Sequence, residues 1–453
     1  KKSSKSKILA DSQIWFLYNS LNELQRNWLN IGSQLIILKG DPILLIPILA
    51  DIIKAEFIYW NKDIEPRSIL EEEKILYQLT KNKKKVSSYW DQLLINPEEL
   101  KTGAGQPYKV YTAFWGNWQK KVSSRKELGC VLEGGLSPAY KPKSLIGISK
   151  AEQEKIKTIF GTKFISTTNL AVENLIKFKG ETICPCQAGE EAGRKQLIEF
   201  ITTNNILKYT YYRDNPISRK TSLISAGLRF GTISPRQAWS KSLEGLQLAV
   251  NYSEIQSIVT WQKELAWREF YQNVLFNFPE VSQGPYRKKW KTFPWINNPA
   301  WLKAWKNGLT GIPIVDAAMR ELKETGWMHN RCRMIVASFL VKDLICNWQY
   351  GEKFFMELLV DGDLASNNGG WQWSASSGVD PKPLRIFNPY LQAKKFDPEG
   401  KYIKKWIPEL SHINKNDLIS GSISPIERRC YPEAIVNHKR QQYIFKSIYK
   451  KLI

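Results

Sequence analysis

The chain has few of the residues that build metal sites and disulfide frameworks. Its 453 residues include three histidines and six cysteines, and the cysteines are scattered along the sequence. The two that lie nearest each other, in Cys184-Pro-Cys186, lack the further ligands that a zinc site requires. We therefore expect reduced thiols, no bound metal and no disulfide-stabilised fold.

Long apolar runs are missing as well. None reaches the length of a membrane-spanning helix, about 20 residues, and the segment Lys1 to Lys7 lacks the apolar core of a signal peptide. The sequence thus predicts a cytoplasmic protein without a membrane partner. Its length and its 43% hydrophobic content allow two or more domains with sizeable cores.

Acidic residues are scarce relative to basic ones. Lys and Arg number 66 against 43 Asp and Glu, a formal charge of +23, and 18 Trp and 19 Tyr are interspersed. Cations neutralise phosphate and aromatic faces stack on unpaired bases, so this mixture favours a nucleic-acid partner. A lysine-rich surface without such a role is the alternative. Membrane-surface binding is less favoured, because no long basic amphipathic helix stands out.

The first part of the chain alternates between strand-like and helix-like segments. Residues 34–38 and 55–60 are short apolar runs rich in β-formers, and residues 42–54 and 67–80 have helical patterns. This alternation predicts a parallel α/β sheet over about residues 1–120, with ligands at the carboxyl ends of its strands, near residues 60–63 and 89–91.

The rest of the chain has a helical pattern. A less patterned connector is expected at 121–188, then an all-α domain at 189–420 and a basic tail at 421–453 that ends in a helix with a frayed end. The predicted helices of the all-α domain include residues 194–207, 255–276, 312–325 and 331–348.

The stretch from Asp361 to Pro389 carries the most chemistry. Its first thirteen residues hold two carboxylates, three carboxamides, two tryptophans and three glycines. Asp beside Gly can hold polar ligand atoms, and Trp371 and Trp373 offer flat faces to a base or a redox ring. A glycine-rich turn before a buried aromatic pair is the alternative, and it fits the whole string poorly.

This stretch resembles the flavin- and substrate-binding core of the photolyase/cryptochrome family, most closely class I cyclobutane pyrimidine dimer photolyases of the deazaflavin-antenna type. The likeness runs from about 190 to 411. It recurs, in the family's order, in Tyr209-x-x-x-Arg213-Asp214-x-Pro216, Thr221-Ser-Leu-Ile-Ser225, Leu228-Arg-Phe-Gly231, Trp261-Gln-Lys-Glu-Leu-Ala-Trp-Arg-Glu-Phe-Tyr271, Thr310-Gly-Ile-Pro-Ile-Val-Asp-Ala-Ala-Met-Arg320 and Gly326-Trp-Met-His-Asn-Arg-Cys-Arg-Met334.

The resemblance implies a bound FAD, and the family holds this cofactor without the Gly-x-Gly-x-x-Gly motif that the chain also lacks. Asp361 is expected to pair with Arg333, and Asp363 to hold the adenine-side sugar. The implied contacts to the cofactor are Tyr209, Thr221, Ser222, Leu223, Ile224, Ser225, Trp261, Arg268, Asn330, Arg333, Asp361, Gly362, Asp363 and Asn367.

Asn367 falls where the family places the residue that faces flavin N5. An amide there can hydrogen-bond reduced flavin without supplying an acid proton, whereas plant cryptochromes carry Asp and animal ones Cys, so Asn argues for repair. Trp371, Trp348 and Trp295 match the chain of three tryptophans that carries electrons between the surface and the flavin. Each tryptophan alone is as consistent with core packing.

The resemblance also implies a pocket for damaged DNA. Trp267 and Trp373 match its two aromatic walls, and Glu264 matches the carboxyl group that hydrogen-bonds the dimer. The (6-4) photolyases have histidines where this chain has Asn330 and Met334, so His329 is expected to be structural. The implied DNA contacts are Arg213, Glu264, Trp267, Arg268, Tyr271, Asn330, Arg331, Met334, Trp373, Arg385 and Gln392.

The implied activity is that of a carbon–carbon lyase, the light-driven repair of cyclobutane pyrimidine dimers in single- or double-stranded DNA by a monomer. Excited reduced FAD gives an electron to a flipped-out dimer and regains it after the ring opens. Asp63 and Arg229 match contacts to an 8-hydroxy-deazaflavin antenna, with methenyltetrahydrofolate as the alternative, although Gln13 replaces a family arginine.

Two other functions stay open. One is a cryptochrome photoreceptor, and the other is a non-catalytic DNA-binding protein that keeps FAD as a structural group. Asn367 and the set of Glu264, Trp267 and Trp373 count against both. Because the family's first strands have no counterpart before Lys1, we also expect an amino-terminally truncated chain with an incomplete α/β sheet.

Overall fold

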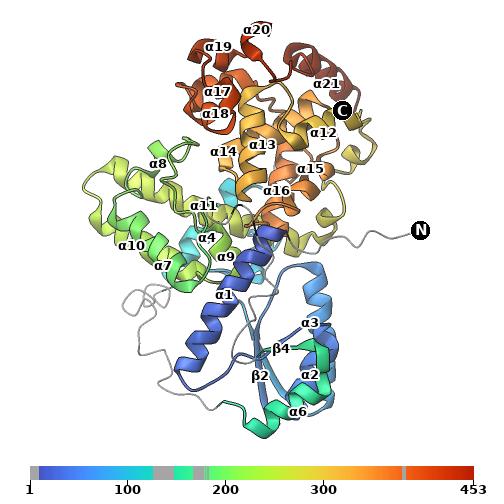
Figure 1. Ribbon diagram of the computed structural model, residues 1–453. Helices are drawn as coiled ribbons and strands as arrows, with labels where there is room; N and C mark the ends of the chain where they lie inside the picture. Colours follow the sequence, from blue (N-terminus) through green and yellow to red (C-terminus); the bar gives the residue numbers. More distant parts are fainter. Residues whose placement is uncertain are drawn as a thin grey trace.

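The computed structural model describes residues 10–125, 147–166, 178, 180, 183–379 and 384–452. Its described part consists of a small α/β unit and a larger, helical part (Figure 1). This confirms the predicted fold class, an α/β unit followed by an all-α domain. Among the described residues, no helix combines the length and the apolarity needed to cross a membrane.

Two parallel strands form the centre of the α/β unit. Strand β2 (Phe57–Asn61) pairs with β3 (Lys85–Tyr89) in register from Phe57 opposite Lys85 to Asn61 opposite Tyr89. Helix α3 (Pro66–Lys81) makes the crossover between them and packs against α2 (Pro42–Ile52). The apolar face of these helices closes over the strands around Ala50, Ile75 and Leu79.

The first predicted strand does not join this pair. Strand β1 (Ile37–Leu38) pairs antiparallel with β4 (Phe164–Ser166), and helix α6 (Lys150–Phe160) packs on α2. A capping box between Ser149 and Glu152 starts α6. Both α6 and β4 fall within the segment 121–188, where a connector is predicted, so the prediction misses them. A short apolar run does not reveal a strand partner so distant in the sequence.

Helix α1 (Asp11–Asn30) joins the α/β unit to the helical part. Ser12 Oγ donates to the Leu358 carbonyl at 2.7 Å, and Gln13 Nε2 donates to the Gly362 carbonyl at 3.0 Å. Phe16 is completely buried and stacks on Phe230. Helix α1 therefore reaches the Asp361 region directly, and Figure 1 shows it running from the helical part alongside the α/β unit.

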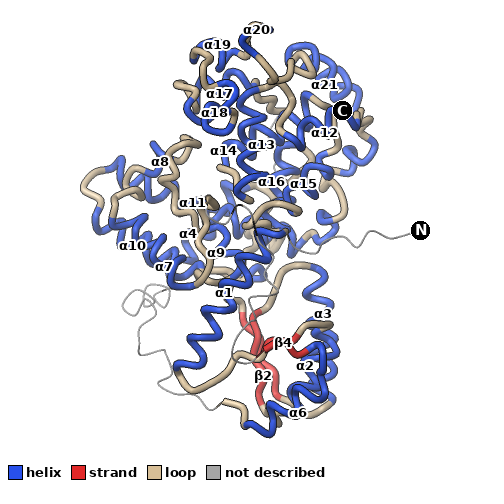
Figure 2. The backbone as a smooth tube through the Cα atoms, viewed as in Figure 1, coloured by secondary structure: helices blue, strands red, loops and turns tan. Residues whose placement is uncertain are grey.

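In the helical part, the long helix α11 (Tyr252–Asn277) contacts α4, α8, α10 and α16. Helices account for nearly all of this part's regular structure in Figure 2. Before the carboxyl-terminal helices, its α-helices are α4 (Tyr111–Ser124), α7 (Glu190–Thr202), α8 (Tyr209–Tyr212), α9 (Ser225–Phe230), α10 (Pro235–Leu248), α12 (Pro299–Asn307), α13 (Pro313–Thr325), α14 (Asn330–Ser338), α15 (Trp348–Met356) and α16 (Leu364–Ala375).

The single helix predicted at 331–348 is wrong. Helix α14 ends at Ser338, a π-helical turn follows at Phe339–Asp343, and Asn347 caps a new helix, α15. The apolar pattern continues through this break, because both sides of it are buried in one core. Periodicity alone therefore gives no sign of the turn.

The carboxyl-terminal segment belongs to the core. Its helices are α17 (Pro389–Phe396), α18 (Lys401–Trp406), α19 (Lys415–Ser420), α20 (Pro425–Arg428) and α21 (His438–Leu452). Helix α21 packs on the π-helical turn and buries Phe445 completely. The predicted basic tail thus contributes a packed helix to the domain.

Candidate functional site: a helical cavity with aromatic walls

A deep cavity of about 520 Å³ lies between α8, α9, α11, α14 and α16. Its volume is within the range of small-molecule and cofactor sites, ~300–1,000 Å³. Of the predicted cofactor contacts, it is lined by Tyr209, Ser222, Ile224, Ser225, Trp261, Arg268, Asn330, Arg333, Asp361, Gly362, Asp363 and Asn367. Thr221 and Leu223 lie beside the cavity wall rather than in it, and Leu223 has a left-handed φ of 55°.

One end of the cavity is polar and ordered by an ion pair. Both oxygens of Asp361 accept from Arg333, at 3.0 and 2.9 Å, and the Asp361 side chain is 4% exposed. Ser225, the first residue of α9, donates to Asp361 at 2.6 Å. Arg333 also donates to the Met328 carbonyl at 2.8 Å. This network presents hydroxyl and guanidinium donors of the kind that hold phosphate and sugar oxygens.

Asp363 and Arg268 are each fixed in the cavity wall by hydrogen bonds to the backbone. Asp363 caps α16 by accepting from the Ser366 amide at 2.7 Å. Arg268 of α11 donates to the carbonyl oxygens of Gln92, at 2.7 Å, and Leu228, at 3.3 Å. The Arg268 guanidinium is thereby fixed in the cavity wall between the two parts of the molecule.

Asn367 is oriented by helix α15. Its amide nitrogen donates to the Glu352 backbone carbonyl at 2.9 Å, while the Glu352 carboxyl accepts from Asn368 at 2.8 Å. Burial raises the pKa of Glu352 to about 7. Because its amide nitrogen is engaged by α15, Asn367 has its carbonyl oxygen available as an acceptor for a ligand in the cavity.

The three predicted redox tryptophans share one core. Trp371 lines the cavity, Trp348 is the first residue of α15, and both are buried, while Trp295 is half-buried. Helices α15 and α16 pack together. The Ile296 amide donates to the Ile345 carbonyl at 2.9 Å, which ties the segment after Trp295 to the one before Trp348.

Other aromatic rings surround this chain. Phe355 and Trp305 contact Trp371 edge-on, with ring centroids 5.0 and 6.1 Å away. Trp305 is absent from the predicted site, and no local motif separates it from the many other tryptophans of the sequence. The chain of three tryptophans as an electron route stays a prediction.

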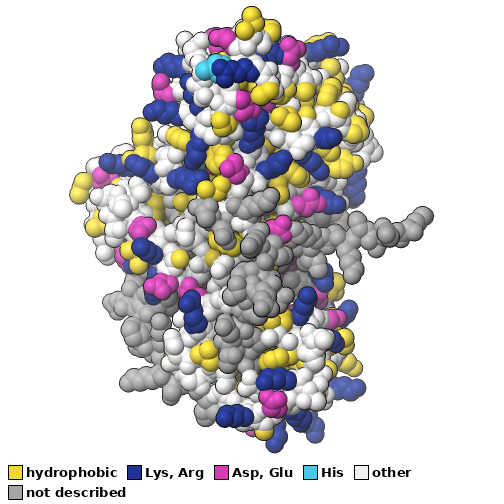
Figure 3. Space-filling view, in the orientation of Figure 1, with side chains coloured by type: hydrophobic (Ala, Val, Ile, Leu, Met, Phe, Trp, Pro, Cys, Tyr) yellow, Lys and Arg dark blue, Asp and Glu magenta, His cyan; other side chains and the backbone are white. Residues whose placement is uncertain are grey.

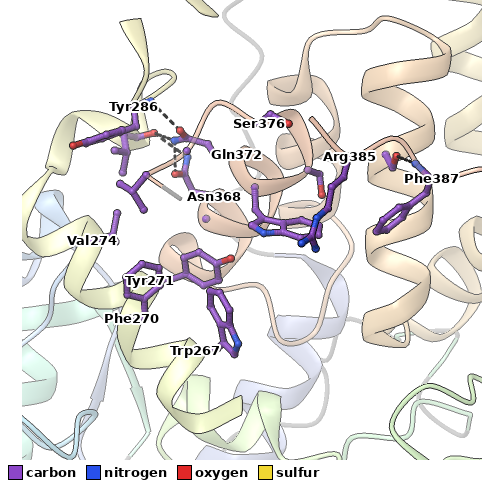
Figure 4. Close-up of a pocket in the computed structure, with 17 residues that line it drawn as sticks. Trp267, Phe270, Tyr271, Val274, Tyr286, Asn368, Gln372, Ser376, Arg385 and Phe387 are labelled. Carbon is purple, nitrogen blue, oxygen red and sulfur yellow. Dashed lines mark hydrogen bonds between the residues drawn. The ribbon is translucent and has the colours of Figure 1, made fainter. Parts of the chain in front are cut away.

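The predicted lesion walls face the same space. Trp267 and Tyr271 of α11 lie on one side and Arg385 lies on the other (Figure 4), and Trp373 lines the same space. The Arg385 guanidinium is 5.9 Å from the Trp373 ring centroid. A smaller apolar hollow continues from this mouth towards Val274.

Trp267 is supported from behind by a residue that sequence reasoning missed. The Tyr111 ring stacks on it, with centroids 3.5 Å apart and planes 4° apart, and the Tyr111 hydroxyl donates to the Lys263 carbonyl at 2.8 Å. Tyr111 lines neither the cavity nor the adjoining hollow. No local pattern could have linked α4 to α11 at this point.

Glu264 is paired with Arg213 at 2.8 Å. Burial raises the pKa of Glu264, and the Arg213 guanidinium opposes that rise. About a third of the Glu264 side chain, 32%, still reaches solvent through the cavity, which limits the effect of burial. The pair presents a carboxylate at the mouth of the cavity, next to Trp267.

Two predicted DNA contacts lie outside the cavity. Arg331 donates to Asp214 at 2.6 Å and covers the ring of Phe396, and Gln392 is half-buried on α17. By contrast, Asn330 and Met334 both line the cavity. Of the string that begins at Asp361, residues 380–383 lie outside the described part.

His329 has the features of a structural residue. Its Nδ1 accepts from the Arg331 amide at 3.1 Å and so caps α14. Burial lowers the pKa of His329 to about 4, and the nearby arginines add to this effect. The ring is therefore neutral at physiological pH, with its proton on Nε2.

Of the predicted antenna residues, Arg229 takes part in a contact between the two parts of the molecule, whereas Asp63 forms its hydrogen bonds within the α/β unit. Arg229 donates to Glu65 at 3.0 Å and to the Gly362 carbonyl at 3.2 Å. Asp63 accepts from the backbone amides of Ile64, at 2.6 Å, and Glu65. Antenna binding by Asp63 and Arg229 stays a prediction. In the described ranges, no group of three or more His, Cys, Asp or Glu side chains could hold a metal ion.

The fold and the cavity define a two-domain protein whose helical domain encloses a large cofactor site next to an aromatic-walled mouth. Residues 1–131 match the family model described as DNA photolyase, and residues 261–451 match the model described as the FAD binding domain of DNA photolyase. Curated relatives agree. The chain is 46% identical over 444 residues to deoxyribodipyrimidine photo-lyase of Synechococcus sp., covering 98% of this chain and 88% of that protein.

A second relative, deoxyribodipyrimidine photo-lyase of Halobacterium salinarum, is 34% identical over 96% of this chain and 86% of its own length. Among solved structures, a class III photolyase from Agrobacterium tumefaciens superposes with a TM-score of 0.84 at 31% identity, covering 100% of this chain and 90% of that one. A Synechocystis cryptochrome gives 0.82 at 26% identity, covering 97% and 89%. The chain belongs to the DNA photolyase family.

Proposed function

We propose that the protein repairs cyclobutane pyrimidine dimers in DNA with light. One observation carries this proposal. A single cavity joins the polar group of Ser225, Asp361 and Arg333 to a mouth walled by Trp267 and Trp373. A cofactor held at the polar group and a flipped-out dimer stacked at the mouth would then share one cavity, as direct electron transfer between them requires.

The residues of the cavity fit FAD. Hydroxyl and guanidinium donors at the Asp361 end suit the diphosphate and sugar oxygens, and Asn367 offers an acceptor to a reduced flavin ring. When bound, reduced FAD supplies the electron that opens the cyclobutane ring and takes it back afterwards. Trp371, Trp348 and Trp295 would carry the electrons that restore the reduced cofactor.

The protein's other task is to bind the damaged bases. Flipping a dimer out of the duplex costs a few kcal/mol, and stacking on Trp267 and Trp373, at ~1–3 kcal/mol per base, offsets that cost. Glu264, which is paired with Arg213, would accept hydrogen bonds from the base edges. Cationic side chains such as Arg385 and Arg331 would contact the phosphates of single- or double-stranded DNA.

A cryptochrome photoreceptor is the second candidate, favoured by the structural similarity to a Synechocystis cryptochrome. Asn367, with its amide nitrogen fixed by Glu352, offers no acid proton at the flavin, and the lesion walls are intact. These features favour repair. A cryptochrome would bind FAD and photoreduce it without reversing dimers.

The finer assignments are part of the same proposal. We place the protein in class I, active as a cytoplasmic monomer, with an 8-hydroxy-deazaflavin antenna near Asp63 and Arg229 and methenyltetrahydrofolate as the alternative. A solved archaeal photolyase from Sulfolobus tokodaii contains two FAD molecules, with the implication of a novel light-harvesting cofactor, so a second FAD is a further outcome to test. The chromophores released by denaturing the purified protein would identify the antenna.

The test of the function is a repair assay with defined oligonucleotides. Protein reconstituted with FAD and chemically reduced is mixed with an oligonucleotide that holds one cyclobutane dimer, then illuminated with blue light. We expect intact pyrimidines to return under light and not in the dark. FAD binding without repair would favour the photoreceptor.

A further inference from the structure

Lys342 is a buried lysine that the proposed mechanism does not use. It lies in the π-helical turn Phe339–Asp343 and is 1% exposed. Among the described residues, no ion pair involves Lys342. The neighbouring Asp343 pairs with His438 of α21, with Nδ1 and Oδ1 2.5 Å apart. A π-helical turn inside an α-helical segment is often found at a functional site.

The Lys342 ammonium group reaches two acceptors of one loop. Its Nζ donates to the Arg385 backbone carbonyl at 2.6 Å and to Ser376 Oγ at 3.1 Å. Ser376 ends α16 with a left-handed φ of 62°, and its amide donates to the Trp373 carbonyl at 3.1 Å. The loop between α16 and α17 is thus held near both of its ends by one side chain.

These two ends carry one wall of the lesion mouth. Arg385 lies over the Trp373 ring, and Figure 4 shows Ser376 and Arg385 across the hollow from Trp267 and Tyr271. Helix α14, which precedes the π-helical turn, adds a third anchor to the loop, because Ser338 Oγ accepts from the Phe387 amide at 3.2 Å. The wall opposite Trp267 therefore depends on groups beneath it as well as on its own residues.

Keeping an ammonium group here is costly. Burial lowers the pKa of Lys342 to about 7, against the weaker opposing effect of Asp343. A buried charge without a carboxylate partner is disfavoured, and an apolar side chain of similar volume would normally stabilise the fold as well or better. The Phe445 ring, with its centroid 5.9 Å from Nζ, offsets only part of this cost. The two hydrogen bonds from Lys342 to the loop therefore point to a role other than stability.

We propose that Lys342 is a positioning residue for lesion recognition, which holds Trp373 and Arg385 in the geometry that stacks on a flipped-out pyrimidine dimer. This inference rests on the proposed function. Lys342 lines neither the cavity nor the adjoining hollow. Lys342 acts through Ser376 and the Arg385 carbonyl, near the two ends of the loop. By holding them, it reduces the rearrangement of Trp373 and Arg385 that accompanies binding of damaged DNA.

The test is Lys342→Met in the full chain loaded with FAD, because methionine keeps most of the side-chain volume and removes the donor. We expect about a tenfold rise in Kd for dimer-containing DNA, the size of losing one or two charged hydrogen bonds. FAD content and photoreduction rate should match wild type, and the affinity for undamaged duplex should fall less than the affinity for dimer-containing DNA, because Arg385 would also contact phosphate. The single-turnover repair rate at saturating DNA should also stay near wild type.

Two further variants sharpen the result. Lys353→Met removes an exposed lysine of α15, and it should leave every readout unchanged. Ser376→Ala removes one of the two acceptors and should raise Kd by about threefold, and it serves as the test if Lys342→Met fails to fold. Wild-type binding of dimer DNA in Lys342→Met, or an equal loss of FAD, undamaged-DNA binding and lesion binding, would overturn the inference. Absence of dimer binding by wild type itself would instead refute the proposed function.

Discussion

Trp371 packs so closely on helix α15 that only glycine fits beneath it. A Cβ atom on Gly351 would lie 2.1 Å from Cη2 of the Trp371 indole, and 2.5 and 2.6 Å from two more ring atoms. Position 351 is inside a helix with ordinary backbone angles, so the need for glycine comes from this contact alone. Trp371, the member of the proposed electron chain that lines the cavity, therefore occupies space that is free only because residue 351 has no side chain.

Gly351→Ala should push Trp371 towards the cavity. We expect weaker FAD retention, slower photoreduction and an overpacking cost of ~1–3 kcal/mol in stability. Gly116→Ala is the matched control, since position 116 is also helical and nothing lies within 4 Å of its Cβ. Photoreduction and FAD content equal to wild type in the Gly351 variant would contradict this packing argument.

Trp295→Phe tests the outer end of the chain. Phenylalanine is too hard to oxidise to relay an electron, so oxidised FAD in this variant should resist photoreduction, while the chemically reduced protein still repairs dimers. Trp115 is a half-buried tryptophan of α4 that is not part of the proposed electron route, so Trp115→Phe should change neither photoreduction nor repair. Unimpaired photoreduction in Trp295→Phe would mean that electrons take another route.

At the residue scale, the sequence identifies most of the side chains that line the cavity and few of those that hold them. Family motifs locate Glu264, Trp267 and Asn367, which the structure brings to one cavity. Tyr111 and Glu352 were missed, because each acts on its partner through a tertiary contact that no local spacing records.

At the scale of secondary-structure elements, the break between α14 and α15 places one of the three proposed redox tryptophans. The segment between the π-helical turn and α15 is strained, since the β-branched residue Ile345 has a left-handed φ of 48°. It lets Trp348 begin a new helix that packs on α16. Periodicity predicts one helix here because burial on both sides masks the turn, whereas the helices α2, α3 and α13 are predicted nearly to their ends.

Helices α13 and α18 are joined by a buried carboxyl group. Tyr402 donates to Glu321 at 2.7 Å, and burial raises the pKa of Glu321 from 4.5 to about 7. Folding therefore favours the protonated form. The stabilising contribution of this group is complete below pH ~4.5 and is lost as the pH rises through ~7.

Glu321→Gln should remove this pH dependence while keeping an oxygen acceptor for Tyr402. As the pH rises from 5 to 8, we expect the free energy of unfolding of the variant to increase relative to that of wild type, by up to about 3 kcal/mol. Thermal unfolding across that range measures it, with exposed Glu73→Gln of α3 as the control. A constant difference between Glu321→Gln and wild type at all pH values would contradict the assigned pKa.

At the scale of the whole molecule, ion pairs join the α/β unit to the helical domain. Arg229 pairs with Glu65, and Arg236 pairs with Asp91, just beyond the carboxyl ends of β2 and β3. The sequence predicts those strand ends as ligand sites, and in the structure their loops contact helices α9 and α10. The predicted domain boundaries were set by composition, so they could not show that α1, α6 and α21 pack across them.

The excess of basic residues predicts that DNA affinity depends on salt concentration. Figure 3 shows Lys and Arg side chains spread over the visible face of the molecule. If several of them neutralise phosphates, log Kd for DNA should rise linearly with log salt concentration, with a slope of about 0.9 per phosphate. Binding titrations between ~50 and ~200 mM salt measure the slope, and salt-independent binding would contradict a phosphate-binding face.

The choice of lesion tests whether the cavity binds and reverses the cyclobutane dimer. The reduced, FAD-loaded protein is illuminated with one oligonucleotide that carries a cyclobutane dimer and with another that carries a (6-4) photoproduct. We expect light-dependent repair of the dimer alone, because Asn330 and Met334, which line the cavity, provide no imidazole there. We also expect weaker repair by Glu264→Ala, a loss of ~1–3 kcal/mol from the unpaired base edge. Reversal of the (6-4) lesion, or no reversal of the dimer by wild-type protein, would show that the lesion site is wrongly assigned.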